Sequence, residues 1–291
     1  MVSKRDTAIK HIFSVDVEEY FQVEAFSRII RKDEWERLPS RVEKSTDRLL
    51  EILGEYNVTG TFFVLGYIAQ RFPRLVKKIF AAGHEIASHG YGHAMVTTLT
   101  PQTFQEDIRK SKQVIEDVIG IPVRGYRAPT FSIMENTSWT YAILLQEGFS
   151  YSSSVFPTLH DRYGWSSFGN APKNMADSEE GEIWELPMSV GSFGPFRMPF
   201  GGGGYLRIYP LWLTKTLFRN IESSGRTGIV YVHPWELDKD QPVIKTSLLS
   251  RFRHHFGIEK MEKKLIGLLR LKNFGSAAQY LDSVKEQSRF S

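Results

Sequence analysis

Two histidines four residues apart, His89 and His93, have the clearest potential for chemistry in this chain. They lie in the stretch SHGYGH, residues 88–93, where two glycines leave the backbone free to make a single turn. Such a turn can bring both imidazoles to one ion, and neutral imidazole is the commonest protein ligand for zinc, copper, iron and nickel. A histidine pair after a strand is also common in surface loops. The pair therefore indicates a metal site only together with other reactive residues.

Those other residues follow further predicted strands. Asp16 and Glu18 end the first predicted strand, His89 follows the third, Arg127 the fourth and His233 the last. In α/β barrels the reacting groups lie at the C-terminal ends of the strands, so we expect these side chains to meet on one rim. Their convergence is the physical argument for a site.

A rim of this composition suits hydrolysis. Two histidines and one carboxylate leave metal positions open, which is typical of a catalytic site, and the cation polarises a carbonyl and lowers the pKa of water. A second carboxylate can accept the proton of the water, while a histidine opposite protonates the leaving group. Asp16 and Glu18 can divide these tasks, and spacing alone leaves open which of them faces the metal. Because an amine leaves poorly unless protonated, the rim indicates hydrolysis of a carbon–nitrogen bond or of an ester.

The elements that must position these residues alternate along the chain. Five segments with apolar residues at helical spacing are predicted helices, at 42–53, 72–80, 100–118, 139–145 and 211–221. Seven apolar or β-branched segments are predicted strands, at 11–17, 59–65, 85–87, 123–127, 151–155, 183–190 and 228–235. Residues 157–181 are turn-rich and polar, as expected of an insertion. Alternation of this kind predicts an α/β fold with a parallel sheet, closed or nearly closed into a barrel.

Composition excludes several functional classes. The chain has no cysteine, so disulfides and thiolate metal ligands are excluded, and any metal must use His, Asp or Glu. The net charge of +4 comes without a clustered basic tract, so we expect no nucleic-acid partner. The polar N-terminus and the absence of a long apolar run predict a protein on the cytoplasmic side with no integral membrane segment. The sequence leaves open whether the chain forms a homo-oligomer.

Four segments together resemble the motifs of the polysaccharide deacetylase family (NodB homology domain, carbohydrate esterase type): SVDVEEYF, SHGYGH, GYRAP and VYVHPWE. The resemblance extends over about residues 11 to 237. The segments PFGGGGYLRIYP and FGSAAQYLDSV resemble a subfamily associated with exopolysaccharide/exosortase gene clusters. The resemblance implies a distorted (β/α)7 barrel of the NodB deacetylase type. We expect one domain over residues 1–291, with a Gly-rich loop at 191–210 and a C-terminal extension at 238–291 packed on it.

The same resemblance implies roles for the rim residues. It implies a divalent metal, commonly zinc, with His89 and His93 as ligands. It also implies that Asp16 is the general base, that Arg127 positions this base, and that His233 is the general acid.

The first motif departs from the common family pattern of two adjacent aspartates, because Asp16 is followed by Val17. Side chains alternate along a strand, so Asp16 and Glu18 share a face while Val17 points away. We therefore predict Glu18 as the third metal ligand, with Glu19 as the alternative.

Further residues are predicted to contact the substrate. Pro129 and Thr130 follow Arg127 after Ala128, and a backbone N–H near Thr130 could hold an oxyanion. Trp235 is predicted to wall a sugar subsite, with core packing as the alternative.

The glycines at 201–204 allow a close backbone approach, which we expect at the mouth of the site, with Arg207 touching an anionic substrate. Glu185 is either the carboxylate that orients His233 or an ordinary strand residue.

The predicted function is that of a metal-dependent hydrolase that removes acetyl groups from an N-acetylated saccharide, either a polysaccharide or a lipid-linked precursor. One alternative is a hydrolase of cyclic amides or imides of the allantoin or hydantoin type, which a small closed pocket would favour. Another alternative is a catalytically silent carbohydrate-binding barrel, which would release no acetate.

Overall fold

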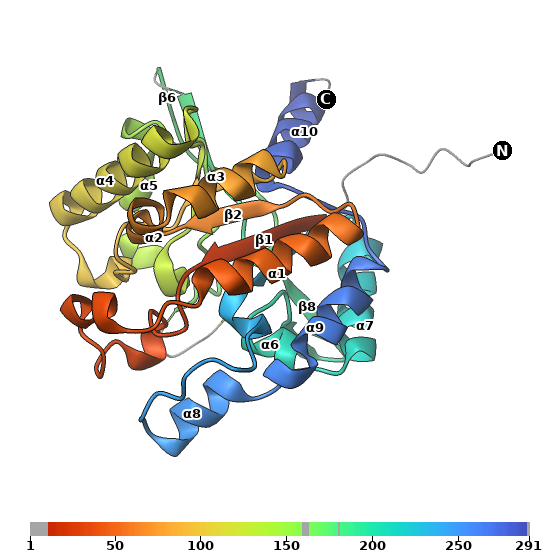
Figure 1. Cartoon of the computed structure of the whole chain (residues 1–291). Helices are drawn as coiled ribbons and strands as arrows, with labels where there is room; N and C mark the ends of the chain where they lie inside the picture. The colour runs from red at the N-terminus through yellow and green to blue at the C-terminus, as the bar shows by residue number, and fades with distance from the viewer. Residues whose placement is uncertain (1–10, 159–162, 180, 290–291) are drawn as a thin grey trace.

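One mostly parallel sheet forms the centre of the molecule (Figure 1). The computed structural model describes residues 11–158, 163–179 and 181–289. Within these ranges nine strands pair in the order β10-β1-β2-β3-β4-β5-β7-β6, with β11 also beside β1, and only β6 and β7 pair antiparallel. The strands are β1 His11–Val17, β2 Thr61–Val64, β3 Glu85–Ser88, β4 Gly125–Tyr126, β5 Tyr151–Ser152, β6 Lys173–Ser178, β7 Gly181–Glu185, β10 Gly228–Val232 and β11 Phe274–Gly275. The predicted α/β class with a parallel sheet is confirmed.

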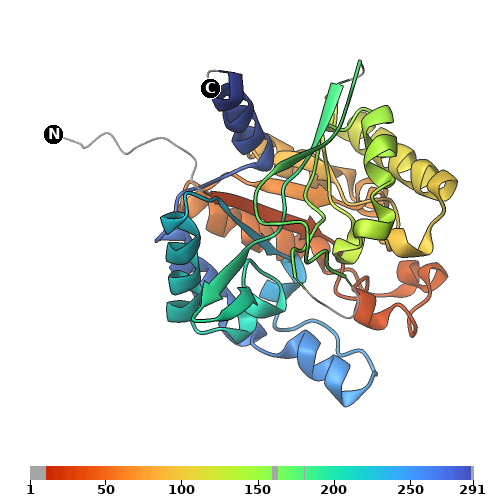
Figure 2. The same cartoon turned by 180° about the vertical axis from the view of Figure 1, so that it is seen from behind.

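Ten helices surround this sheet in the described ranges, most of them on its outer face, as Figures 1 and 2 show from opposite sides. They are α1 Val42–Glu55, α2 Gly66–Arg71, α3 Pro73–Ala81, α4 Pro101–Ile119, α5 Thr140–Gln146, α6 Gly204–Ile208, α7 Leu211–Ser223, α8 Leu248–His255, α9 Ile258–Leu269 and α10 Ala277–Arg289. Helix α4 illustrates the local signals: the Thr100 hydroxyl accepts the Thr103 N–H, Pro101 occupies the first turn, and Gly120 ends the helix with φ 75°. None of the helices in the described ranges is long and apolar enough to cross a membrane.

Strand β1 is buried on both faces, which divides its side chains between two environments. Phe13, Val15 and Val17 belong to the main apolar core. Ile12 points the other way, into a second cluster that includes Phe63 and Tyr231. Because side chains alternate along a strand, the polar residues that follow Ile12 at even positions line this inner side and reach its C-terminal end.

An irregular segment closes the gap between β7 and β10. The Ile229 N–H donates to the Ser189 hydroxyl at 2.6 Å, and Gly202 forms a parallel bridge with Tyr231. A Cβ on Gly202 would lie 1.8 Å from the Tyr231 carbonyl oxygen, so only glycine permits this approach. The barrel is thus distorted where glycine backbone replaces a regular strand.

The structure differs from the sequence prediction mainly after residue 157. The predicted insertion contains β6, whose side chains are largely exposed and therefore give no apolar signal, although 159–162 and 180 lie outside the described residues. The predicted strand at 183–190 is β7 followed by the start of a hairpin, β8 Val190–Phe193 and β9 Phe196–Pro199. Most of the predicted Gly-rich loop at 191–210 is therefore this hairpin and α6.

The predicted extension covers residues 238–291, and its described part, residues 238–289, contacts the sheet and other helices. Helix α9 contacts α6 and α7, and β11 pairs with β1. The assignment of the whole chain to one domain stays a prediction.

Candidate active site

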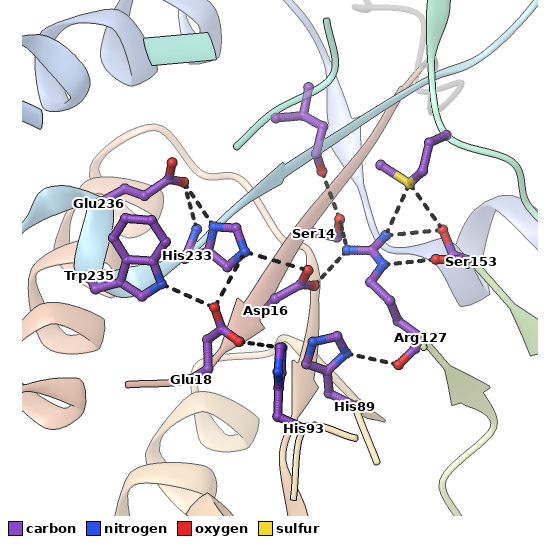
Figure 3. A network of polar contacts seen from close by, with 12 residues as sticks. Ser14, Asp16, Glu18, His89, His93, Arg127, Ser153, His233, Trp235 and Glu236 are labelled. Carbon is purple, nitrogen blue, oxygen red and sulfur yellow. Dashed lines mark hydrogen bonds and ion pairs between the residues drawn. The ribbon is translucent and has the colours of Figure 1, made fainter. Parts of the chain in front are cut away.

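The end of β1 carries two buried carboxylates side by side. Asp16 and Glu18 point to the same side of the strand, into a cavity of about 200 Å³, while Val17 packs in the core (Figure 3). Both carboxylates are nearly inaccessible to solvent. Burial of two acids without compensating partners would be costly, so the groups that face them decide what the site can do.

Glu18, His89 and His93 form a group that can hold a metal ion. Their ligand atoms all lie within 4.8 Å of one another, and His93 Nε2 is 2.8 Å from Glu18 Oε2. His89 Nδ1 lies 2.8 Å from the carbonyl oxygen of Arg127; donation by Nδ1–H leaves the lone pair of Nε2 for a cation. Two imidazole nitrogens and one carboxylate oxygen fit a zinc-like cation with open positions for water and substrate.

The protonation states suit cation binding. Burial lowers the pKa of His89 to about 4, so its imidazole is neutral at pH 7. Burial also opposes ionisation of Glu18, but the charge and hydrogen bond of His93, with the charges of His233 and His89, lower the pKa of Glu18 to about 2. The group therefore presents a carboxylate beside a neutral imidazole.

A network of polar contacts fixes the turn between the two histidines. Gly90, with φ 73°, passes so close to Asp107 that a Cβ would lie 2.8 Å from its Oδ2. This Asp107 oxygen accepts the Tyr91 N–H at 2.9 Å, and the Ser111 hydroxyl donates to the Gly90 carbonyl. His93 itself adopts φ 52°, a strained conformation for a residue with a side chain. Helix α4 thus holds the turn in the shape that aims His93 at Glu18.

Glu19, the alternative third ligand, has a different task. Its carboxylate accepts N–H groups of Arg41 and Val42 and the Ser40 hydroxyl, at the start of α1. It therefore caps the N-terminus of a helix, where a negative charge is favourable. Glu19 is absent from the group of possible metal ligands among the described residues, and Glu18 takes the place.

Arg127 holds Asp16 from behind. Its NH1 donates to Asp16 Oδ1 at 2.7 Å and to the Ser14 hydroxyl at 2.9 Å, and the guanidinium is fully buried over the Phe63 ring at 4.1 Å. Its other side donates to the carbonyl and hydroxyl oxygens of Ser153. The contact fixes Oδ1 and leaves Asp16 Oδ2 facing the cavity.

Glu185, considered as the residue that orients His233, instead supports the Arg127 side. Its carboxylate accepts the N–H groups of Ser154 and Val155 at 2.7 and 2.8 Å, next to the residue that binds Arg127. The Tyr141 hydroxyl donates to its second oxygen. Glu185 is thus a fully buried loop anchor.

The residue that does orient His233 is Glu236, three positions later. Glu236 Oε2 accepts the His233 backbone N–H at 3.0 Å and lies 3.2 Å from His233 Nδ1, which turns Nε2 toward the cavity. There Nε2 lies 3.9 Å from Asp16 Oδ2 and 3.7 Å from Glu18 Oε1. One sequence signal could have identified Glu236. It lies three residues after His233, with Pro234 between them, and this is the spacing of a capping box.

The predicted substrate contact of Arg207 is wrong. Its guanidinium is buried and donates to Glu236 Oε1 at 2.7 Å and to the carbonyl oxygens of His254 and Phe256. All of these partners lie behind the site, and Arg207 does not line the cavity. Arg207 reaches the site through Glu236 and His233, and its guanidinium also lies 5.4 Å from the centre of the Trp235 ring.

This arrangement keeps His233 protonated. Burial opposes its charge, but the hydrogen bond and charge of Glu236, with the charges of Glu18 and Asp16, raise the pKa of His233 to about 9. Burial likewise opposes ionisation of Glu236, while His233 and Arg207 lower its pKa. His233 can therefore donate a proton at neutral pH.

Of the other residues predicted to contact the substrate, two line the cavity and one does not. Thr130 and Trp235 line it, together with the backbone at Gly203 and Gly204, whereas Pro129 is not among the lining residues. Trp235 also donates its indole N–H to Glu18 Oε1 at 3.2 Å and stacks on His233 with 5.0 Å between ring centroids. Trp235 thus fixes the ligand and the acid as well as forming a wall.

Two family profiles and several known proteins match parts of this chain. The family profile "Polysaccharide deacetylase" matches residues 34–146, and the profile "Domain of unknown function (DUF3473)" matches residues 153–282. A peptidoglycan deacetylase of Helicobacter pylori is 30% identical over 149 residues, which are 51% of this chain and 50% of that protein. The chain thus spans about half the length, or less, of the first curated relatives that it matches.

Solved structures share the fold. A putative polysaccharide deacetylase from Mycobacterium smegmatis superposes with a TM-score of 0.60 at 24% identity, over 96% of this chain and 92% of the other. The Puue allantoinase superposes with a TM-score of 0.56 at 14% identity, over 92% of this chain and 86% of the other. Residues 34–146 are therefore similar to polysaccharide deacetylases and residues 153–282 to the DUF3473 family, and the chain has the α/β fold of solved structures of polysaccharide deacetylases.

Proposed function

We propose that the protein is a metal-dependent hydrolase that removes acetyl groups from an N-acetylated saccharide. The observation that carries this proposal is the meeting of three potential ligands, an arginine-held carboxylate and a protonated histidine at one cavity of about 200 Å³. A cation held by Glu18, His89 and His93, zinc in our proposal, would polarise the acetyl carbonyl and lower the pKa of water.

In this proposal Asp16 is the general base. Its Oδ1 is fixed by Arg127, so Oδ2 is the oxygen free to accept a proton from the attacking water. Because Arg127 donates from a fully buried position, Asp16 cannot rotate away from the cavity without losing its partner.

His233 is the general acid. Its Nε2 faces Asp16 across the cavity, while Nδ1 is held by Glu236, so a proton on Nε2 points to the place of the leaving nitrogen. An amine is expelled about 10²–10⁴ times faster when a positioned acid protonates it. The residues therefore divide proton removal and proton donation between two sides of one cavity.

The substrate class rests on the wall residues and on the relatives. Aromatic side chains line the cavity, among them Phe131, Tyr163 and Tyr231, and the Helicobacter relative is named a peptidoglycan deacetylase. The cavity suits a single acetamido sugar, with a polymer or lipid-linked chain continuing outside it. Association with exopolysaccharide synthesis and a cytoplasmic location remain predictions from the sequence.

Cyclic amide or imide hydrolysis is the second candidate, and the size of the cavity is the observation that favours it. A volume of about 200 Å³ also accommodates a molecule of allantoin size. Turnover of allantoin or hydantoin without acetate release from N-acetyl sugars would decide for this candidate.

The test is a metal analysis of the purified protein combined with an acetate-release screen over chitooligosaccharides and peptidoglycan fragments. We expect one divalent cation per chain, and acetate release that a chelator abolishes and zinc restores. Saccharide binding without acetate release from a metal-loaded protein would identify a catalytically silent carbohydrate-binding barrel instead.

A further inference from the structure

Helix α8 and the loop before it present an apolar surface to solvent, which we call the α8 surface and define by Val243, Phe252 and Phe256. These side chains are 62%, 60% and 42% exposed, and the two phenylalanine rings contact each other at 4.9 Å between centroids. With Arg251 and His255 they line one shallow hollow. Exposed apolar patches of this kind usually mark a binding surface.

The charged residues of the segment that carries the α8 surface are all basic, between Asp240 before it and Glu259 after it. Residues 241–258 contain no Asp or Glu, while Lys245, Arg251 and Arg253 are all exposed. None of these three cations forms an ion pair within the described part of the chain. An anionic partner with an apolar interior complements this combination, and an anionic bilayer supplies both properties over one surface.

The opposite side of α8 is joined to the active site. His254 is buried, hydrogen-bonds to Gln241 at 2.8 Å and stacks on Trp235 with 4.4 Å between ring centroids. Trp235 in turn stacks on His233. Figure 1 shows α8 projecting from the lower edge of the molecule, so a partner can reach its outer face. The α8 surface is therefore connected to the active site through His254 and Trp235.

We propose that the α8 surface docks the protein on an anionic lipid bilayer. Phe252, Phe256 and Val243 enter the interfacial region while the cations contact lipid phosphates. The following step rests on the proposed function: an enzyme docked in this way would act on saccharides carried by a lipid of that bilayer. Docking itself involves neither Asp16 nor the metal ligands, so it can be tested apart from catalysis.

The experiment is a vesicle flotation assay with the full chain. We expect binding to vesicles made of equal parts phosphatidylcholine and phosphatidylglycerol, and much weaker binding to phosphatidylcholine alone. The Phe252→Ser/Phe256→Ser variant should bind the anionic vesicles at least about tenfold more weakly, because two apolar side chains no longer enter the bilayer. The matched control is Ile121→Ser, which removes an exposed apolar side chain far in sequence from the α8 surface. This variant should bind the vesicles like the wild type.

Further variants test the contribution of the cations to docking and the independence of docking from catalysis. Arg251→Gln/Arg253→Gln should weaken binding to anionic vesicles and reduce its sensitivity to salt. Asp16→Asn should float with vesicles as the wild type does, and the single variant Phe252→Ser should hydrolyse a soluble substrate at the wild-type rate. Absence of vesicle binding, or equal loss with Ile121→Ser, would overturn the proposal. Conversion of a dimer to a monomer by the phenylalanine variant, without vesicle binding, would assign the α8 surface to self-association instead.

Discussion

The two sides of the cavity are built in different ways. The metal side, Glu18, His89 and His93 with Asp16 and Arg127, comes from residues before 130 and is held largely by backbone groups and α4. The acid side, which we define as His233 with Glu236 and Arg207, comes from residues after 200. It is held by a chain of ion pairs between buried side chains.

That chain of ion pairs ends in the C-terminal extension. Arg207 donates to the carbonyl oxygens of His254 and Phe256, and His254 stacks on Trp235. The extension therefore supports His233, the proposed acid, although none of its described residues lines the cavity. Neither matched region contains all of the site residues: Asp16 and Glu18 precede both regions, His89, His93 and Arg127 lie in the first, and His233 lies in the second.

The largest effect is expected on the metal side. His89→Ala should lose the cation and lower kcat/KM by at least about 10³-fold, because the several kcal/mol that a bound cation supplies disappear with it. Metal content and acetate release measure this change. The matched control is His84→Gln, at the other end of the same strand, where Nδ1 only accepts the Gly60 N–H. Equal metal loss in both variants would mean that His89 acts through folding.

Asp16→Asn should separate chemistry from metal binding. We expect kcat to fall about 10²–10⁴-fold with the cation retained, because the amide cannot accept the proton of water. Steady-state kinetics and metal content are measured on the same sample. If the variant instead lost its cation, the roles assigned to Asp16 and Glu18 would be reversed.

Glu236→Gln should affect only the acid side. His233 must be protonated to act as the acid. Glu236 helps to raise the pKa of His233 to about 9, so activity is expected to fall as the pH rises through that value. With glutamine the pKa of His233 should drop, and the alkaline limb of kcat/KM should move to lower pH. The control Glu262→Gln changes an exposed carboxylate paired with Arg48. An unmoved alkaline limb would contradict the role of Glu236.

The smallest effect should come from Glu19→Gln. Loss of the charge at the start of α1 is expected to lower the free energy of unfolding by about 1 kcal/mol. Urea denaturation measures this change, while the metal content should stay that of the wild type. Loss of the cation from this variant would return Glu19 to the ligand set in place of Glu18.

The same difference between the two sides explains what could be predicted from the sequence. The helices and parallel strands follow from apolar periodicity, and the pairing of Asp16 with Glu18 follows from alternation along one strand. The histidines of the turn are close in sequence, so their spacing is informative without a fold.

Contacts that depend on tertiary register could not be predicted in this way. Nothing in the sequence places Arg207 against Glu236 rather than in the cavity, because the direction of its side chain depends on α6 and the extension. Glu185 had the right residue type and lay at a strand end, but its neighbours in space are the 153–155 backbone. Strand β6 and the β8–β9 hairpin expose most of their side chains, which removes the apolar pattern that marks a strand.

Crystals grown with zinc, with anomalous diffraction recorded at the zinc edge, test the central claim most directly. We predict one strong anomalous peak within bonding distance of Glu18 Oε2, His89 Nε2 and His93 Nε2, with Asp16 bound to Arg127 and not to the ion. A peak elsewhere, or an ion bound by Asp16 while Glu18 faces away, would contradict the account.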